Sequence, residues 1–329
     1  MLTALVLSLP LIVAGAQAPQ DPPILPRVPL TFATEARTVN LTVTVRGLDG
    51  KLLKDLTAAD FTVYEDDRPQ PIQFFARVFD PSRANDEGQE GAPDPTAIDL
   101  GMLFDTSSSM ADVLRLSQNA ASQFLEAIPR ARELTTVFFD SDIRLSRFGG
   151  ESQQGLFDRL HKAKSGGDTL LYDSIAVYLS RVSDEPGRKI VVIFTDGEDQ
   201  KSLVTIAELR DLVRSSTVTI YPILFKGKYT DASSGLRANV LMRELAELTG
   251  GELFSPRDFK DLQPIYDGLL DELAAQYVIG YVPQEDAAPG EHRLRVEVKQ
   301  TGAKVRHRRG YRVAPPEKAM PAQAPPKKK

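Results

Sequence analysis

The chain has no cysteine, which excludes disulfide bonds, thiolate metal sites and a cysteine nucleophile. Only three histidines occur in its 329 residues, and the positions of His161, His292 and His307 do not give the spacing of a zinc site, so zinc is not expected. The formal net charge is only −5, so bulk electrostatics favours neither nucleic acid nor an anionic membrane as a partner. The 42% hydrophobic and 26% charged content is ordinary for a globular protein with a sizeable core.

A long apolar run occurs only at the N-terminus, in MLTALVLSLPLIVAGAQAPQ, where small residues with A-x-A spacing follow it. This pattern is typical of a secretory signal peptide. The run is shorter than the roughly 20 residues of a transmembrane helix. A buried helix at the start of a domain is disfavoured, because the run has no polar face and prolines follow it directly. We therefore predict a signal peptide over residues 1–18, a secreted or periplasmic protein, and no transmembrane segment after cleavage.

Two segments far apart in the chain show the alternation of β-strands with one solvated face. In the first, Val39, Leu41, Val43 and Val45 alternate with polar residues, and further strands are predicted over residues 61–65 and 72–78, on either side of a turn at DDRPQ. The second includes QYVIGYVP and HRLRVEVKQ. Since each set alone would make a marginal sheet, we predict that both chain ends complete one small antiparallel β-sandwich.

Between these segments the pattern changes to continuous apolar strands separated by amphipathic helices. This pattern predicts an α/β domain with a doubly wound, mostly parallel sheet, inserted in the β-sandwich. The predicted organisation is a proline-rich linker over 19–37, sandwich strands over 38–80, an acidic linker over 81–97, the α/β domain over 98–275, sandwich strands over 276–313 and a disordered tail over 314–329. The predicted strands of the α/β domain are 98–104, 134–139, 143–148, 189–196 and 218–225, and the predicted helices are 111–128, 154–163, 172–182, 206–214, 238–248 and 259–274.

Polar side chains follow two of the predicted parallel strands. Asp105 ends the first strand and is followed by Ser107 and Ser109, whose spacing in an extended loop points all three side chains the same way. Asp196 ends the strand in KIVVIFTD, and Thr169 lies in a glycine-containing loop before a helix. Ligands of open parallel sheets bind beyond the carboxyl ends of the strands, so these side chains are expected to meet if the two strands are neighbours.

This set of carboxylate and hydroxyl oxygens suits Mg²⁺, with Mn²⁺ or Ca²⁺ as alternatives. Because the hydroxyl ligands are neutral, the ion would keep enough positive charge to accept a further carboxylate, such as an Asp or Glu side chain of a protein ligand. The competing explanation is helix capping, with Ser108 or Ser109 at the start of the helix near Ala111. The presence of Thr169 and Asp196 on separate elements favours the metal site.

The motifs DTSSS, GGDT and FTDGED, in this order, resemble the metal-ion-dependent adhesion site (MIDAS) of von Willebrand factor type A domains. The resemblance covers residues 98 to about 275 and implies Asp105, Ser107, Ser109, Thr169 and Asp196 as metal ligands in a noncatalytic adhesion module. The flanking segments are similar to those of exported bacterial proteins called von Willebrand factor A related. Asp168 departs from the pattern, since related sequences more often have glycine there, and its carboxylate either tightens metal binding or points to solvent.

Two other functions stay open from the sequence. A Mg²⁺-dependent phosphoryl-transfer hydrolase could use Asp105 as nucleophile, but the DxD pattern of such enzymes has Ser107 at its second aspartate. The second alternative is a structural component of the envelope whose metal site is degenerate. The sequence identifies neither the ligand nor the oligomeric state.

Overall fold

The computed structural model describes residues 38–78, 96–127, 131–149, 153–182, 187–226, 232–283 and 288–313. The predicted signal peptide, the proline-rich linker, nearly all of the acidic linker and the C-terminal tail lie outside these described residues. Within the described ranges, no helix has the length and apolar character needed to cross a membrane.

A five-stranded sheet forms the centre of the α/β domain, in the order β7-β6-β5-β8-β9. Its strands are β5 (Ile98–Asp105), β6 (Glu133–Phe139), β7 (Ile143–Gly149), β8 (Arg188–Thr195) and β9 (Val218–Leu224). Strand β5 pairs in parallel with both β6 and β8, whereas β7 is antiparallel to β6. Every residue of β5, β8 and β9 is buried, as expected for a parallel sheet covered on both faces.

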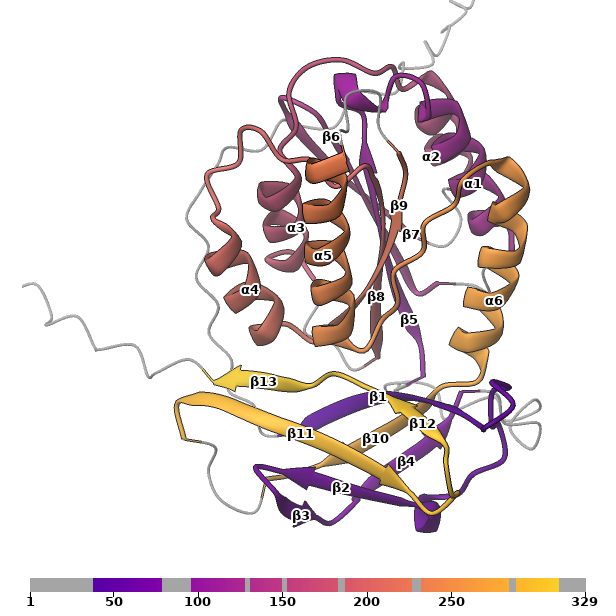
Figure 1. Cartoon of the computed structure of the whole chain (residues 1–329), viewed down its shortest axis with the longest axis vertical. Coiled ribbons are helices and arrows are strands. Elements are labelled where there is room, and N and C mark those ends of the chain that lie inside the picture. The colour runs from indigo at the N-terminus through magenta and orange to yellow at the C-terminus, as the bar shows by residue number, and fades with distance from the viewer. Residues whose placement is uncertain are drawn as a thin grey trace, which may run out of the picture.

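Helices cover both faces of this sheet (Figure 1). On one face lie α1 (Leu114–Ala127), α2 (Gln153–Lys162) and α6 (Leu262–Ala274), and on the other lie α3 (Leu171–Leu179), α4 (Ile206–Ser215) and α5 (Ala232–Thr249). Each group packs on its own hydrophobic cluster, one containing Phe104 and Phe194 and the other Leu103 and Ile193. The predicted doubly wound α/β architecture is confirmed.

Strands from the two ends of the described chain build the second domain (Figure 1). They form two four-stranded sheets, β12-β1-β10-β4 and β13-β11-β2-β3. The strands are β1 (Val39–Arg46), β2 (Phe61–Glu65), β3 (Arg68–Gln70), β4 (Phe74–Arg77), β10 (Tyr277–Tyr281), β11 (Gly290–Val298), β12 (Lys304–Arg306) and β13 (Gly310–Val313). All pairings are antiparallel, and one hydrophobic cluster joins the two sheets. The α/β domain is therefore inserted in a β-sandwich, as predicted.

Some predicted boundaries were wrong for identifiable physical reasons. The DDRPQ segment is not all turn, because a two-residue turn at Asp66 and Asp67, with φ of 49° and 64°, lets strand β3 begin at once. Such paired positive φ values match a tight hairpin turn. The helix predicted from Ala111 starts at Leu114, since a short 3₁₀ helix, η3 (Ser108–Met110), precedes it.

The two domains meet through a buried ionic cluster at the C-terminal end of α6, which leads directly into β10. The Glu272 carboxylate is only 1% exposed and pairs with Arg46 at 3.1 Å and with Arg306, both from the sandwich. It also accepts a hydrogen bond of 2.9 Å from the Tyr221 hydroxyl of β9. At the start of β8, the Arg188 guanidinium donates to the carbonyl of Leu273 at 2.7 Å. The sandwich thus contacts the amino ends of the parallel strands and leaves their carboxyl ends on the far side.

Candidate metal centre at the carboxyl ends of β5 and β8

The two aspartates predicted to share a site lie at the ends of neighbouring strands. Asp105 is the last residue of β5, and Asp196 directly follows β8. The register pairs Phe104 with Phe194, so both strands end at the same level. From β5 the chain continues to β6 on one side of it, and later to β8 on its other side. The order of the strands therefore reverses between β5 and β8, and open α/β sheets bind ligands at such a switch point.

The first loop gathers three of the predicted ligands. The Ser107 hydroxyl donates to Asp105 Oδ1 at 2.5 Å, and the oxygens of Ser107 and Ser109 lie 3.1 Å apart. Both serines are buried, whereas Ser108 between them is exposed. Ser109 belongs to the 3₁₀ helix η3 and not to an extended loop, so the side chains converge although the predicted backbone was wrong.

Helix capping does not account for the Ser107 side chain. Ser107 occupies the N-cap position of η3, but its side chain makes no capping hydrogen bond. The Ser107 hydroxyl donates instead to the carboxylate of Asp105, another of the predicted metal ligands. This geometry concerns Ser107 alone, and capping by Ser108 or Ser109, which the sequence offered as the competing explanation, stays a prediction.

Backbone hydrogen bonds join the glycine-containing loop to the first loop. The Gly166 amide donates to the carbonyl of Thr106 at 2.8 Å, and the Ser108 amide donates to the carbonyl of Gly167 at 3.1 Å. Gly167 has φ of 77°, and a Cβ built there would lie 2.6 Å from Ser141 Oγ. Only glycine fits this position without strain, which explains the glycine beside the predicted ligands.

Thr169 is tied in turn to the loop that carries Asp196. The amides of Gln200 and Lys201 both donate to the Thr169 carbonyl, at 3.0 and 3.1 Å. The Glu198 amide donates to Asp196 Oδ1 at 3.1 Å. The three loops that hold the predicted ligands are thus connected to one another by their backbones.

Two oxygens of this group have no hydrogen-bond partner although they are buried. They are the hydroxyl oxygen of Thr169 and Oδ2 of Asp196, on side chains that are 0% and 1% exposed. Leaving a buried polar group unpaired costs about 1–3 kcal/mol, and more for a charged group. Because hydroxyl and carboxylate oxygens are the donors that Mg²⁺ prefers, a hard cation fits this arrangement.

Burial disfavours the ionised forms of both aspartates, and repulsion by Asp196 adds to this effect for Asp105. Burial, and then the charge of Asp196, raise the pKa of Asp105 to about 7, against the lowering effect of hydrogen bonds from Ser107 and Thr195. Burial likewise raises the pKa of Asp196. Two carboxylates placed this close, in a site that penalises their charge, favour a bound cation.

One residue that supports the site was missed in the sequence. The Thr195 hydroxyl donates to Asp105 Oδ2 at 2.6 Å and accepts a hydrogen bond from the Gly197 amide at 3.0 Å. The sequence signal that could have identified Thr195 was its position directly before Asp196, at the end of β8. Asp168, the departure from the motif, has a half-exposed side chain whose Oδ2 lies 4.0 Å from Lys201 Nζ, so its carboxylate faces a surface lysine.

The fold and these residues define a doubly wound α/β domain with an oxygen-donor site at the carboxyl edge of its sheet. Residues 101–198, which run from β5 through Asp196, match the family model of the von Willebrand factor type A domain. This part of the chain is thus similar to the von Willebrand factor type A domain, the family whose motifs the sequence resembles. A search of curated protein sequences found no match.

Several solved structures are similar to the chain at low sequence identity. A von Willebrand factor type A protein from Catenulispora acidiphila is 13% identical, with a TM-score of 0.46 and a match that covers 66% of each chain. An aerotolerance-related membrane protein from Bacteroides fragilis is 14% identical, with a TM-score of 0.42, and the match covers 54% of this chain and 98% of that one. Proximal thread matrix protein 1 from the mussel byssus, with a zinc-occupied MIDAS motif, is 20% identical, with a TM-score of 0.44 and coverage of 59% and 50%.

Proposed function

We propose that the chain is an exported, noncatalytic binding module that grips an acidic group of a protein ligand through a divalent cation. Asp105, Ser107, Ser109, Thr169 and Asp196 would hold the ion, which is of the Mg²⁺ type, with Mn²⁺ or Ca²⁺ as possible substitutes. The observation that carries the proposal is the pair of buried oxygens without partners, Thr169 Oγ1 and Asp196 Oδ2, on loops that backbone hydrogen bonds connect.

The donor set supports binding of an external carboxylate. Three of the proposed ligands are neutral hydroxyls, so the two aspartates at most neutralise a divalent ion. A Glu or Asp carboxylate of the protein ligand would then coordinate the ion at a position that faces outward. The site lies at the end of the α/β domain away from the sandwich, so a protein ligand can approach it (Figure 1).

The surroundings of Asp105 favour binding over phosphoryl transfer. Its side chain is buried, and its two oxygens accept hydrogen bonds from Ser107 and Thr195. In hydrolases with a DxD pattern, the second aspartate acts as the general acid. Ser107 stands where these hydrolases carry that second aspartate.

The proposed export rests on the N-terminal sequence. The apolar run and the A-x-A spacing over residues 1–18 support a cleaved signal peptide and a secreted or periplasmic location. The absence of cysteine is compatible with any compartment, because a chain without thiols does not respond to the redox state around it.

A thermal melt followed by a capture experiment tests the function. The mature protein is melted with Mg²⁺, Mn²⁺ or EDTA, and we expect the cations to raise the melting temperature, because a ligand that binds only the folded state stabilises it. Immobilised protein is then exposed to envelope extract with Mg²⁺, and the bound proteins are eluted with EDTA. A partner released by EDTA and not captured by an Asp105→Ala variant that remains folded supports the proposal.

The melt, the capture and an added assay of phosphate-ester hydrolysis separate the rival functions. A melting temperature that does not change with any divalent ion would contradict the metal site and favour a structural envelope component. Hydrolysis of a generic phosphate ester that requires both Mg²⁺ and Asp105 would favour the phosphoryl-transfer alternative. Capture that persists in EDTA would show that the ligand binds elsewhere on the chain.

A further inference from the structure

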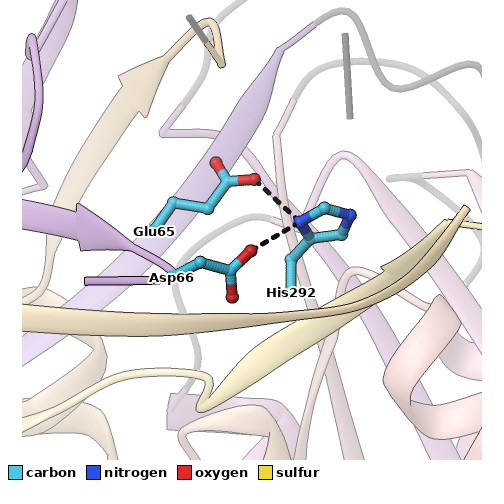
Figure 2. Close-up of side chains that lie close together, drawn as sticks. All are labelled: Glu65, Asp66 and His292. Atoms are coloured by element: carbon cyan, nitrogen blue, oxygen red, sulfur yellow. Dashed lines mark hydrogen bonds and ion pairs between the residues drawn. The ribbon is translucent and has the colours of Figure 1, made fainter. Parts of the chain in front are cut away.

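A second group of metal-ligating side chains lies on the β-sandwich, in the domain that the proposed adhesion site does not use. Glu65 ends β2, Asp66 begins the turn into β3, and His292 lies on the adjacent strand β11 (Figure 2). One ligand atom from each residue lies within 4.8 Å of the others. Glu65 is buried, the His292 side chain is 12% exposed and Asp66 is exposed, so the group is open to solvent on one side.

The hydrogen bonds of the His292 ring require a cation between the histidine and the carboxylates. Nε2 lies 2.8 Å from the carbonyl oxygen of Ala288, which can only accept, so Nε2 carries a proton. Nδ1 lies 3.2 Å from Glu65 Oε1 and 3.0 Å from Asp66 Oδ2 (Figure 2). A neutral ring protonated at Nε2 would direct the lone pair of Nδ1 at two carboxylates. Either a second proton or a metal ion must therefore lie between them.

Groups outside the cluster hold each ligand in place. The hydroxyls of Tyr281 and Tyr311 donate to the two oxygens of Glu65, each at 2.7 Å. The Tyr311 ring also stacks on the His292 ring, with centroids 5.1 Å apart. Metal-binding histidines typically donate their second ring N–H to a carbonyl or carboxylate, as Nε2 does here, and such supports fix the orientation of the ligands.

The turn that carries Asp66 aims its carboxylate at the histidine strand. Asp66 follows Glu65, which pairs with Leu294 of β11, so it continues the contact of β2 with β11, and its φ of 49° starts the turn into β3. There the Asp66 amide donates to the carbonyl of Arg293, and the Arg293 amide donates to Asp66 Oδ1 at 2.8 Å. Oδ2 is left to face Nδ1 of His292. The turn and these hydrogen bonds thus position one oxygen of Asp66 for the cluster.

We propose that Glu65, Asp66 and His292 bind a divalent transition metal ion of the zinc class. One imidazole nitrogen and two carboxylate oxygens are ligands that zinc accepts, with water in a fourth position on the open side. The separations of 3.0 and 3.2 Å from Nδ1 are close to the edge of about 3.3 Å of a tetrahedron around zinc. The ion would join the β2–β3 hairpin to β11, and this site is independent of the proposed adhesion site.

Zinc uptake by the full mature chain tests this proposal. Zinc is titrated calorimetrically into the wild-type, His292→Gln, Asp66→Asn and His161→Gln proteins, with folding checked by circular dichroism. We expect the wild type to bind one more zinc ion per chain than His292→Gln, and the affinity of that ion to fall by about tenfold or more in Asp66→Asn. His161→Gln, which removes an exposed histidine on α2, is the matched control and should bind zinc as the wild type does.

Cobalt substitution gives a second readout. Co²⁺ bound through a histidine nitrogen in a four-coordinate site absorbs visible light, and we expect this absorption in the wild type but not in His292→Gln. Equal zinc uptake by the wild-type and His292→Gln proteins would overturn the proposal and show that a proton bridges the group. If His292→Gln does not fold, zinc binding by folded Asp66→Asn with wild-type stoichiometry and affinity would overturn it equally.

Discussion

The polar side chains at the carboxyl edge of the α/β sheet differ in how many hydrogen bonds they make within the protein. Thr195 donates to Asp105 and accepts from Gly197, so its hydroxyl has partners on both sides. The Thr169 hydroxyl is as deeply buried and has none. Since an unpaired buried hydroxyl disfavours the folded state, the proposed metal ion would give Thr169 the partner that the described side chains do not supply.

This contrast gives a paired prediction for two threonines. Thr169→Val should leave the metal-free stability unchanged or slightly raised, because no hydrogen bond is lost, and should reduce the Mg²⁺-induced rise in melting temperature. Thr195→Val, the matched control, should destabilise the metal-free protein by about 1–3 kcal/mol, because the Asp105 carboxylate loses a buried donor. Chemical denaturation and thermal melts with and without Mg²⁺ measure both effects. A metal response of wild-type size in Thr169→Val would remove this threonine from the ligand set.

The raised pKa of Asp105 predicts opposite pH dependences for the metal-free and metal-bound protein. Because burial raises its folded pKa to about 7, above the unfolded value, its contribution to the metal-free stability is complete below the unfolded pKa and is lost as the pH rises towards 7. The Mg²⁺ ion needs the ionised carboxylate, so the stabilisation by Mg²⁺ should be small near pH ~5 and large near pH ~8. Melts across this range measure the difference, and a Mg²⁺ effect that does not change with pH would contradict the assignment of Asp105.

At the scale of the elements, a close approach of α3 to β5 keeps the ligand loops in place. The Tyr178 ring of α3 lies against Gly101 of β5, where a Cβ would come within 2.3 Å of the ring. Helix α3 directly follows the loop of Thr169, and β5 ends in Asp105. The absence of a side chain at Gly101 therefore sets the distance between the two elements that carry these ligands.

Adding a methyl group at Gly101 should disturb this packing. We expect Gly101→Ala to lower the free energy of unfolding by about 1–3 kcal/mol, because the aromatic ring and α3 must shift. Gly268→Ala on α6 is the matched control, since a Cβ there meets nothing within 4 Å and alanine favours a helix by about 0.8–1.0 kcal/mol over glycine. Denaturant titrations of both variants provide the measurement, and equal stability of the two would contradict the role of Gly101.

The elements also show what the sequence could and could not predict. The continuous apolar runs of β5 and β8 predicted both strands, because such runs are a local property of the sequence. That the two strands are neighbours, which brings Asp105 and Asp196 to one edge of the sheet, is a property of the fold and was only a condition of the prediction. The bond from Thr195 to Asp105 depends on the register between β5 and β8, which no local pattern contains. The cluster at His292 joins residues 226 positions apart, so histidine spacing, which argued against zinc, gave no sign of it.

At the scale of the whole molecule, the buried cluster around Glu272 joins the inserted domain to the sandwich. Replacing one partner of a buried ion pair leaves the other charge uncompensated and costs about 3–5 kcal/mol. We expect Glu272→Ala to lower the free energy of unfolding by about this amount, because Arg46 and Arg306 lose their shared carboxylate. Glu297→Ala, which breaks the exposed pair with Arg295, is the control and should change stability by about 1 kcal/mol or less. Similar effects of the two variants in denaturant titrations would show that the joint contributes little.

The central claim is that three loops at the carboxyl edge of the sheet meet around one divalent cation. The most direct measurement is a crystal structure of the protein soaked with Mn²⁺, in which anomalous scattering locates the ion. The account predicts a peak in contact with the oxygens of Asp105, Ser107, Ser109, Thr169 and Asp196, directly or through water. Ordered loops in a Mn²⁺-soaked crystal with no peak among these residues would contradict it.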